Sequence, residues 1–552
     1  ACTDRAWHGA GRRSSLNPPA ASRALSNAQI ARAAVVVLVG FLASGVLGLI
    51  RTAVIGAQFG TSAALDAFIA AQRVPEIVFV LVAGGALGSS FIPIYARLRE
   101  QDSAEAWRLA SAVMTLAALA ALALGVIVAL AAPWLVSSVL LRESPPEAQA
   151  LTAEMMRLMM ATPAIFAVSG LVMGILQAHG LFLLPSLAIS MNNIGLIIGA
   201  LAIAPALPPD AGIGQVGGAN VYGLAYGAVL SAALHLAVQL PGLWRVRARL
   251  RFLPDWRAPG VLRVLALMGP RVLGLAVVQI NFLVNIVLTD RMVSGSLAAL
   301  TYAFTLMFFA LGVIGQSVGA AVFPTLSALA AANDFDGFND RLARALRGVL
   351  FLALPATVTL IVMGKPLVEV LYQRGEWTAQ DTAATAWALA FYATGIAGFA
   401  LLEVLSRAFY ALADTWTPVR VGIAAMLSNI VLSLIFIQII GQPGSLARGP
   451  FAGLALANAL TTLLEALALW WLLRRRVGAA SDRYVLSGAA RTGLAALALG
   501  AALLLVTRAA GGALLTLAAG AAVGGAVFFG AAALLKVEEA VSVPRALLRR
   551  LR

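Results

Sequence analysis

The sequence predicts an all-α, polytopic membrane protein with about fourteen transmembrane helices, and three observations support this fold class. Of the 552 residues, 61% are hydrophobic and only 11% are charged, whereas soluble domains are about half apolar and about a quarter charged. The apolar residues form long continuous runs without the alternation that is typical of strands. Basic residues gather in the short connectors between these runs. The excess apolar surface therefore has to face lipid, and helices satisfy the backbone there.

The length of the apolar runs places the individual helices, because a bilayer core about 30 Å thick requires roughly 20 apolar helical residues. The first six are expected at 31–57, 65–96, 108–139, 150–178, 183–206 and 219–243. The next four are expected at 261–289, 297–330, 342–364 and 380–412. The last four are expected at 418–441, 449–473, 485–507 and 512–536.

The charges of the loops predict the orientation of these helices. With a cytoplasmic N-terminus, every even-numbered loop is cytoplasmic. Loops two, six, eight and twelve are rich in arginine, whereas the fifth loop, 207–218, has no Lys or Arg. We therefore expect a multi-pass protein of the bacterial inner membrane with both termini cytoplasmic. Residues 1–30 are expected to form a disordered cytoplasmic tail, 244–260 a basic cytoplasmic loop and 537–552 a basic cytoplasmic tail.

Two pairs of matching segments suggest an internal repeat. Ser90–Pro93 resembles Ala321–Pro324 at an offset of 231 residues, and Leu176–Ala178 with Pro185 resembles Phe409–Ala411 with Pro418 at an offset of 233. These spacings predict two six-helix lobes, 31–243 and 261–473, around a central cavity, with two further helices in 485–536. A chance match between segments rich in Ala, Leu and Pro is the alternative.

Charged residues inside the apolar spans are candidate site residues, because an ionisable group in a bilayer is costly unless it faces a cavity or a partner. The candidates are Arg51 in helix one, Asp66, Arg73 and Glu76 in helix two, and Arg271 in helix seven. Arginines in a cavity suit an anionic headgroup, because arginine binds phosphate through charge-assisted hydrogen bonds. The structural alternatives are snorkelling of Arg51 to the interface and an ion pair between Asp66 and Arg73, which share a helix face.

Other polar residues in the spans have structural interpretations. Glu403 and Arg407 are spaced for an intrahelical salt bridge. Asn192, Asn193 and Asn429 suit hydrogen bonds between helices, with ligand contacts as the alternative.

Several classes of function are not expected. A single cysteine excludes a disulfide framework, and three scattered histidines make a histidine-rich metal site improbable. The segment Gly212–Gly217 matches the dinucleotide-binding pattern but lies in a short loop outside any βαβ unit. We therefore expect neither an enzyme nor a nucleic-acid-binding protein.

Short motifs along the chain carry a family resemblance. They are Gly48-Leu49-Ile50-Arg51, Asp66-Ala67-Phe68, Gln373-Arg374-Gly375-Glu376-Trp377, Arg407-Ala408-Phe409-Tyr410-Ala411 and Asp414-Thr415-Trp416-Thr417-Pro418-Val419. With these motifs the sequence resembles, from about residue 27 to 540, the MurJ (MviN) lipid II flippases of the multidrug/oligosaccharidyl-lipid/polysaccharide exporter superfamily. The resemblance implies alternating-access transport of undecaprenyl-diphosphate-linked peptidoglycan precursor (lipid II) from the inner to the outer leaflet. It places the family's cavity arginine at Arg51 and its helix-two aspartate at Asp66.

The sequence departs from the family pattern at positions where a basic residue is usual, namely Gly45, Phe79, Val80 and Thr305. The expected substrate-binding set is therefore Arg51, Asp66, Arg73 and Arg271. Asn429 resembles a cation-site position, and Ser433 stands where the family has an acidic partner, so these two residues form a candidate ion or polar site. Coupling to a cation or to the membrane potential is an open question, and no other cofactor is expected.

Other functions stay open on the sequence alone. They are a flippase for another polyprenyl-linked glycan, a cation-coupled exporter of the same superfamily, and a non-transporting scaffold. The missing basic residues favour the first of these, while the basic residues near the cavity argue against cationic cargo. The expected partners are a polyprenyl-diphosphate-linked glycan lipid, membrane lipids and cell-wall synthases.

Overall fold

The computed structural model describes residues 27–84, 90–209, 212–312, 314, 317–478 and 482–540. These residues are almost entirely helical, and the sheet within them is one hairpin, in which β1 (Gln215–Val216) pairs antiparallel with β2 (Ala219–Asn220). The expected tail at 1–30 lies mostly outside the described residues, and so do residues 541–552 of the expected C-terminal tail. Residues 27–30, at the end of the expected N-terminal tail, already belong to a helix.

The helices follow the order of the apolar runs. The first half contains α1 (Asn27–Phe59), α2 (Ala63–Phe79), η1 (Val80–Gly84), α3 (Ile92–Gln101), α4 (Ser103–Leu135), η3 (Val136–Leu140), α5 (Pro146–Met159), α6 (Thr162–Ala178), α7 (Leu183–Ile198), η4 (Gly199–Ile203), α8 (Ala204–Ala206), α9 (Tyr222–Ala237) and α10 (Leu240–Arg245). The second half contains α11 (Val261–Thr289), α12 (Ser296–Leu311), α13 (Ser317–Ala331), α14 (Phe335–Tyr372), α15 (Ala379–Ala393), α16 (Ile396–Ala411), α17 (Trp416–Ile439), α18 (Ala452–Val477), α19 (Asp482–Ala509) and α20 (Ala513–Leu534).

The all-α membrane fold is confirmed. Among the described residues, nine helices are long and apolar enough to cross a bilayer, or ten if the bent pair α15 and α16 forms one span. The bend of 46° lies at Thr394 and Gly395, where the expected span 380–412 is interrupted. The Thr394 hydroxyl donates to the Phe391 carbonyl there, and glycine is a poor helix former. The total of about fourteen spans stays a prediction.

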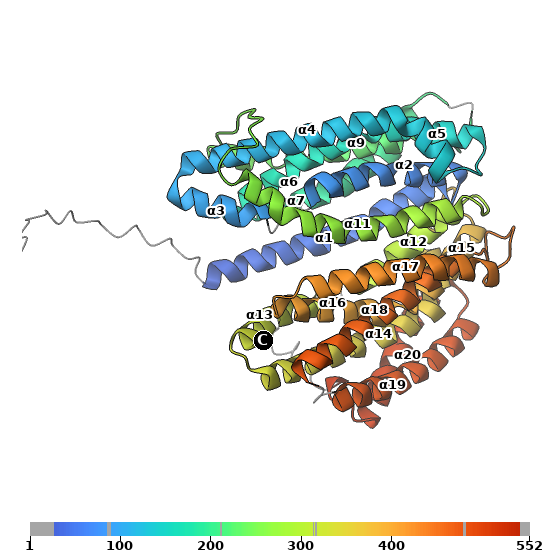
Figure 1. Ribbon diagram of the computed structural model, residues 1–552. Coiled ribbons are helices and arrows are strands. Elements are labelled where there is room, and N and C mark those ends of the chain that lie inside the picture. Colours follow the sequence, from blue (N-terminus) through green and yellow to red (C-terminus); the bar gives the residue numbers. More distant parts are fainter. Residues whose placement is uncertain are drawn as a thin grey trace, which may run out of the picture.

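Two groups of helices lie side by side (Figure 1). Helices α2–α9 form one group and α12–α20 the other, with α1 and α11 between them. We call residues 27–245 the first lobe and residues 261–477 the second lobe. Helices α19 and α20 pack against α14 on the outer side of the second lobe. That the lobes are sequence repeats stays a prediction.

Small residues bring helices of the first lobe close together. A Cβ atom on Gly195 of α7 would lie 2.4 Å from the Cα atom of Ser231 in α9, so only glycine fits at this crossing. Close backbone approach of this kind stabilises helix pairs in lipid. It fixes α7, whose Asn193 donates to the Ser44 carbonyl of α1 at 3.1 Å, which confirms the predicted hydrogen bond between helices.

The two ends of the bundle have different loops. One end carries the α3–α4, α13–α14 and α18–α19 turns and the arginine-rich connector between α10 and α11, and we call it the basic end. The other end carries the α1–α2, α11–α12 and α14–α15 turns, and we call it the joined end because the lobes meet there. In Figure 1 the basic end lies on the left and the joined end on the right.

Candidate functional site

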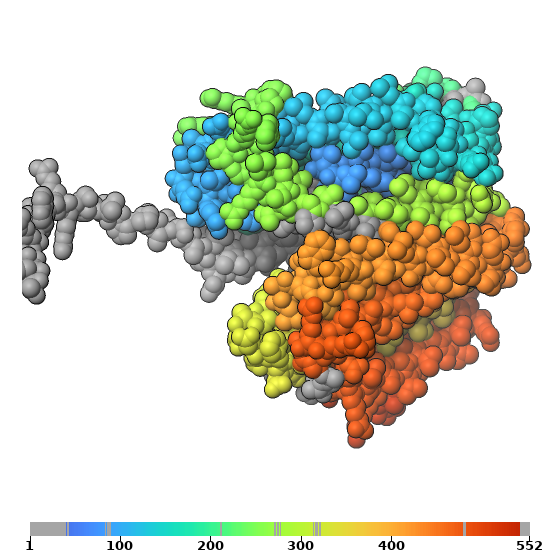
Figure 2. All heavy atoms as spheres, viewed as in Figure 1, coloured from blue at the N-terminus to red at the C-terminus, as the bar shows by residue number. Residues whose placement is uncertain are grey.

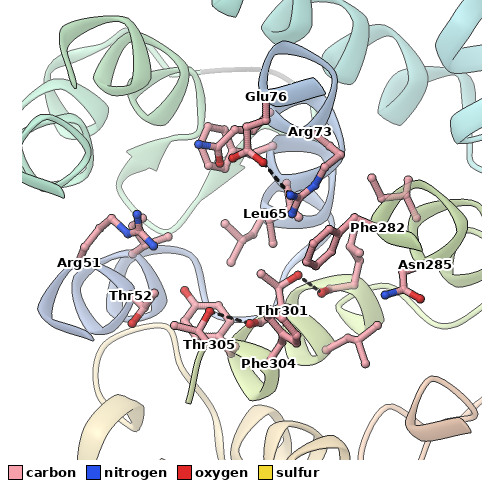
Figure 3. A pocket seen from close by; sticks show the side chains of 18 of the residues that line it. Arg51, Thr52, Leu65, Arg73, Glu76, Phe282, Asn285, Thr301, Phe304 and Thr305 are labelled. Carbon is pink, nitrogen blue, oxygen red and sulfur yellow. Dashed lines mark hydrogen bonds and ion pairs between the residues drawn. The ribbon is translucent and has the colours of Figure 1, made fainter. Parts of the chain in front are cut away.

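A cavity of about 300 Å³ lies between the two lobes. Its walls come from α1, α2 and α7 of the first lobe and from α11, α12 and α15 of the second. Polar side chains line it together with aromatic ones (Figure 3). The polar lining consists of Arg51, Thr52, Gln72, Arg73, Glu76, Asn192, Asn285, Thr301, Tyr302 and Thr305.

Arg51 projects from α1 into this cavity and is half-buried (Figure 3). No carboxylate of the described residues forms an ion pair with its guanidinium group. The neighbouring Thr52 contacts the hydroxyl of Tyr372 in α14 at 3.2 Å, which holds this part of α1 against the second lobe. The structure therefore places an arginine without a partner carboxylate in the wall of an inter-lobe cavity.

Arg73 and Glu76 lie on α2, on the opposite wall (Figure 3). The guanidinium of Arg73 donates to the Glu76 carboxylate at 2.7 Å and lies over the ring of Phe282, 4.2 Å from its centroid. The Nε atom of Arg73 is buried without a hydrogen-bond partner. The alternative in which Arg73 pairs with Asp66 is therefore wrong, because the nearer carboxylate, three residues along the helix, takes its place.

Asp66 lies outside the cavity lining, at the joined end. Its carboxylate accepts hydrogen bonds from the backbone N–H groups of Gly295, at 2.6 Å, and Ala298, at 2.7 Å. These groups form the N-terminus of α12, where unpaired donors and the helix dipole favour a negative charge. Asp66 of the first lobe thus caps a helix of the second lobe in this conformation.

Further contacts join the lobes at this end. The Thr61 hydroxyl donates to the Asp381 carboxylate at 2.5 Å, and the Glu376 N–H donates to the Ala57 carbonyl at 2.9 Å. The turn at Gly375 has φ +63°, and a Cβ atom there would lie 2.2 Å from the Ala57 carbonyl oxygen. The motif Gln373–Trp377 is therefore a turn that closes onto α1 and requires glycine at its centre.

The predicted ion or polar site lies elsewhere, inside the second lobe. Asn429 and Ser433 are buried in α17, and the Asn429 amide donates to the Thr461 hydroxyl of α18 at 3.3 Å. The Oδ1 atom of Asn429 and the hydroxyl of Ser433 are buried without hydrogen-bond partners. Within the described residues, no group of three or more His, Cys, Asp and Glu side chains is arranged to hold a metal ion.

The remaining predicted residues fall at different places. The backbone of Arg271 belongs to α11, but its side chain lies outside the described part of the structure. Of the positions where the family's basic residues are missing, Thr305 lines the cavity, and its hydroxyl donates to the Thr301 carbonyl at 2.9 Å. A side chain at Gly45 would start 3.4 Å from the Phe309 ring. The Glu403–Arg407 salt bridge is confirmed, at 2.5 Å.

A second cavity, of about 290 Å³, lies within the first lobe and was not predicted. It shares Gln72, Glu76 and Asn192 with the central cavity and also reaches His235 of α9. The His235 ring accepts from or donates to the Ser169 hydroxyl at 2.6 Å. The sequence shows His235 as a histidine inside an apolar run. The cavity itself could not be predicted, because its other lining residues come from segments far apart in the sequence.

Comparisons with known proteins agree with this architecture. Residues 55–520 match the family model described as lipid II flippase MurJ. The lipid II flippase MurJ of Burkholderia cenocepacia is 31% identical over 441 residues, which cover 79% of this chain and 82% of that protein. The probable lipid II flippase MurJ of Vibrio cholerae is 29% identical over 455 residues, which cover 80% and 82% of the two chains.

Solved structures support the same fold. A lipid II flippase MurJ in an inward closed conformation superposes with a TM-score of 0.73 at 23% identity, covering 91% of this chain and 98% of that one. An inward-facing multidrug resistance transporter of the MATE family superposes with a TM-score of 0.63 at 16% identity, covering 79% and 94%. The family model spans most of the sequence, and the Burkholderia relative is similar along most of its own length. The chain belongs to the MurJ family of lipid II flippases.

Proposed function

We propose that the protein is a lipid II flippase of the bacterial inner membrane, with both termini cytoplasmic, that works by alternating access. The observation that carries this proposal is Arg51, a half-buried arginine with no partner carboxylate among the described residues, in a cavity between two lobes. An unpaired cation in a low-dielectric site favours an anionic ligand. A diphosphate supplies the required charge and several acceptors for the guanidinium donors.

The cavity offers groups for the rest of the headgroup as well. Arg73 keeps a buried Nε donor without a partner, and Asn192, Asn285 and Thr301 add amide and hydroxyl groups. Such side chains suit the hydroxyl and amide groups of a sugar–peptide headgroup. Arg73 takes over the role of the basic residues that Phe79 and Val80 replace, from a position roughly two turns earlier on α2.

The polyprenyl chain requires a different surface. An apolar groove of about 340 Å³ runs between α14, α19 and α20, and its lining includes Leu499, Leu503 and Phe528. Gly520 and Gly524 let α20 lie close to α14 and α19, since a Cβ atom there would lie 2.6 Å from Met363 and 2.8 Å from Leu499. The groove accommodates an isoprenoid chain while the headgroup crosses the membrane in the cavity.

The joined end forms the gate of the transport cycle. Because arginine-rich loops mark the cytoplasmic side, the basic end is cytoplasmic and the joined end faces outward. The conformation described here is then closed to the outside and accepts substrate from the inner leaflet. Outward opening requires the contacts of Asp66, Thr61 and Glu376 with the other lobe to break. Substrate binding shifts this equilibrium only through contacts that differ between the two states.

Coupling to a cation involves the buried site in the second lobe. The free Oδ1 atom of Asn429 and the hydroxyl of Ser433 supply neutral oxygen ligands, beside Thr461. Hard cations such as Na⁺ prefer oxygen ligands. Alternatively, the membrane potential acts directly on the diphosphate, at about 2.3 kcal/mol per charge and 100 mV.

The test is the rescue of a bacterium depleted of its own lipid II flippase. Wild-type protein, Arg51→Ala and the control Arg291→Ala are expressed, and their amounts in the membrane are measured. We expect wild type and the control to restore growth and Arg51→Ala to fail, since Arg291 is exposed at the joined end and pairs with Glu143 at 3.6 Å. Failure of well-expressed wild type would contradict lipid II transport.

A second candidate is transport of another polyprenyl-diphosphate-linked glycan. Thr305 favours it, because this cavity residue stands where the family usually has arginine. Rescue of a strain that lacks the flippase for such a glycan, by wild type but not by Arg51→Ala, would support this candidate.

A further inference from the structure

The connector between the two lobes carries a row of exposed arginines. We call residues 244–257 the arginine strap. Arg245, Arg247, Arg249 and Arg251 are exposed, while the residues between them are half-buried. Val246, Ala248, Leu250 and Leu253 pack against an apolar cluster formed by α3, α4, α6 and the start of α11. The strap thus has an inner apolar side and an outer basic side.

Hydrogen bonds fix the strap on the surface of α4. The backbone N–H groups of Arg251 and Leu253 donate to the hydroxyls of Ser111, at 3.1 Å, and Thr115, at 3.0 Å. Asp255 accepts from Arg108 at 3.0 Å, and this hydrogen bond holds the pKa of the Asp255 carboxyl below its usual range. Figure 2 shows the green atoms of the strap region lying over the blue atoms of α3 and α4. The strap therefore has a defined position at the basic end.

The outer arginines have no counter-charge within the described protein. No carboxylate there forms an ion pair with Arg245, Arg247, Arg249 or Arg251. Arg245 ends helix α10, and Val246 and Arg247 form a turn, so an extended path begins only after them. In an extended chain, alternate residues such as Arg249 and Arg251 lie roughly 7 Å apart on the same side. Like charges at this spacing repel one another within the Debye length. A fixed row of this kind calls for an anionic partner.

Aromatic side chains lie on the same outer surface. Trp244 is 77% exposed, Phe252 74% and Trp256 53%. The strap contacts α4 at Ser111 and Thr115, and the next turns of α4 expose Leu119 and Leu122. The strap thus lies just before the apolar surface that faces lipid. Tryptophan and arginine are typical of this boundary.

We propose that the arginine strap is a binding surface for anionic phospholipid headgroups of the leaflet at the basic end. The arginines attract phosphate groups, and the exposed aromatic side chains enter the headgroup region. The exposed rings favour a bilayer over a soluble acidic protein or a nucleic acid, which would leave them in water. The strap then holds the connector between the lobes at the membrane surface. This proposal does not depend on the identity of the transported lipid.

The test measures tryptophan quenching in the purified full-length protein by brominated lipids. Detergent-solubilised protein is titrated with brominated phosphatidylglycerol or brominated phosphatidylcholine. The contribution of the strap is the difference between the protein and its Trp244→Phe/Trp256→Phe variant. We expect phosphatidylglycerol to quench these two tryptophans at lower concentration. Arg245→Gln/Arg249→Gln/Arg251→Gln should weaken this preference at least about tenfold, because each arginine near a surface contributes roughly fivefold.

Two matched variants separate charge from fold. Replacement of the same three arginines by lysine should retain the preference, since the charge is kept. Arg142→Gln/Arg448→Gln/Arg508→Gln removes equal charge from exposed positions at the joined end and should also retain it. Equal quenching by both lipids, quenching by neither, or an unchanged preference in the strap triple variant would overturn the proposal. Quenching by neither would indicate that the strap faces water or a protein.

Discussion

The two ends of the bundle are held together in different ways. At the joined end, polar contacts cross from one lobe to the other, as between Asp66 and Gly295 or between Thr61 and Asp381. At the basic end, the ion pairs of the described residues stay within one lobe and its attached segments, as between Arg476 and Asp414 at 2.5 Å. The described lobes also touch at the basic end, but through apolar side chains, since Val261 and Val264 of α11 pack against α3, α4 and α6. Polar fastening of the lobes at the joined end suits one state of an alternating-access cycle.

If the lobes separate at the joined end during transport, locking that end should have the largest effect. In a variant without Cys2, Thr61→Cys and Asp381→Cys place two thiols where a 2.5 Å contact now lies. We expect oxidation to abolish rescue and a reductant to restore it, because outward opening requires these residues to separate. Each single cysteine variant serves as the control. Full activity of the oxidised double variant, with the disulfide verified by mass spectrometry, would rule out a gate at this position.

Substitution of Gly375 at the joined end should also impair transport strongly, and Gly444 offers a matched control. Gly375→Ala places a Cβ atom 2.2 Å from the Ala57 oxygen, whereas Gly444→Ala meets nothing within 4 Å, although both residues have positive φ. Both variants carry a backbone penalty of about 1–2 kcal/mol. Only Gly375→Ala should also open the joined end and impair rescue. Equal behaviour of the two variants would show that the contact with α1 does not hold the gate.

The cap on α12 should have a moderate effect. Asp66→Asn removes the negative charge that two backbone N–H groups of the second lobe share. The closed state should lose about 1–2 kcal/mol of stability relative to the outward-open state. We expect a membrane-impermeant maleimide, applied from outside, to label a cysteine at cavity residue Thr301 roughly tenfold faster. Glu105→Gln, an exposed change in α4 at the basic end, is the control and should leave the labelling rate unchanged.

At the basic end a single ion pair should matter least. Asp255→Asn removes the negative charge from the contact with Arg108, and exposed ion pairs contribute little to stability. Because the folded pKa of Asp255 is lowered, its contribution is complete above the unfolded pKa of about 3.9 and is lost as pH falls through the folded pKa. We expect a small decrease in Tm near neutral pH that disappears in strong acid, without faster labelling at Thr301. Much faster labelling of Thr301→Cys in this variant would contradict the view that contacts at the joined end, and not those at the basic end, hold the closed state.

The sequence predicted the all-α membrane fold because membrane insertion depends on local composition, whereas the expected spans 65–96, 297–330 and 380–412 are each divided between two or more helices. Apolar runs and arginine-rich loops are visible without any knowledge of neighbours, and so was Arg51 as an unusual charge. The role of Asp66 was not accessible, because its partners on α12 lie more than 200 residues away. The pair of Arg73 and Glu76 was available from their spacing, but a spacing rule alone does not decide between this pair and one with Asp66.

The joined end is held partly by main-chain atoms, whereas the cavity is lined by side chains, so mutation affects the two differently. The turn at Gly375 fastens to α1 through main-chain atoms, since the Glu376 N–H meets the Ala57 carbonyl and the glycine contributes no side chain. Substitutions elsewhere in the chain leave such a bond intact as long as the backbone path is kept. The cavity, in contrast, is defined by side chains such as Arg73 and Thr305. Natural variation can therefore retune what the protein carries without rebuilding how it opens.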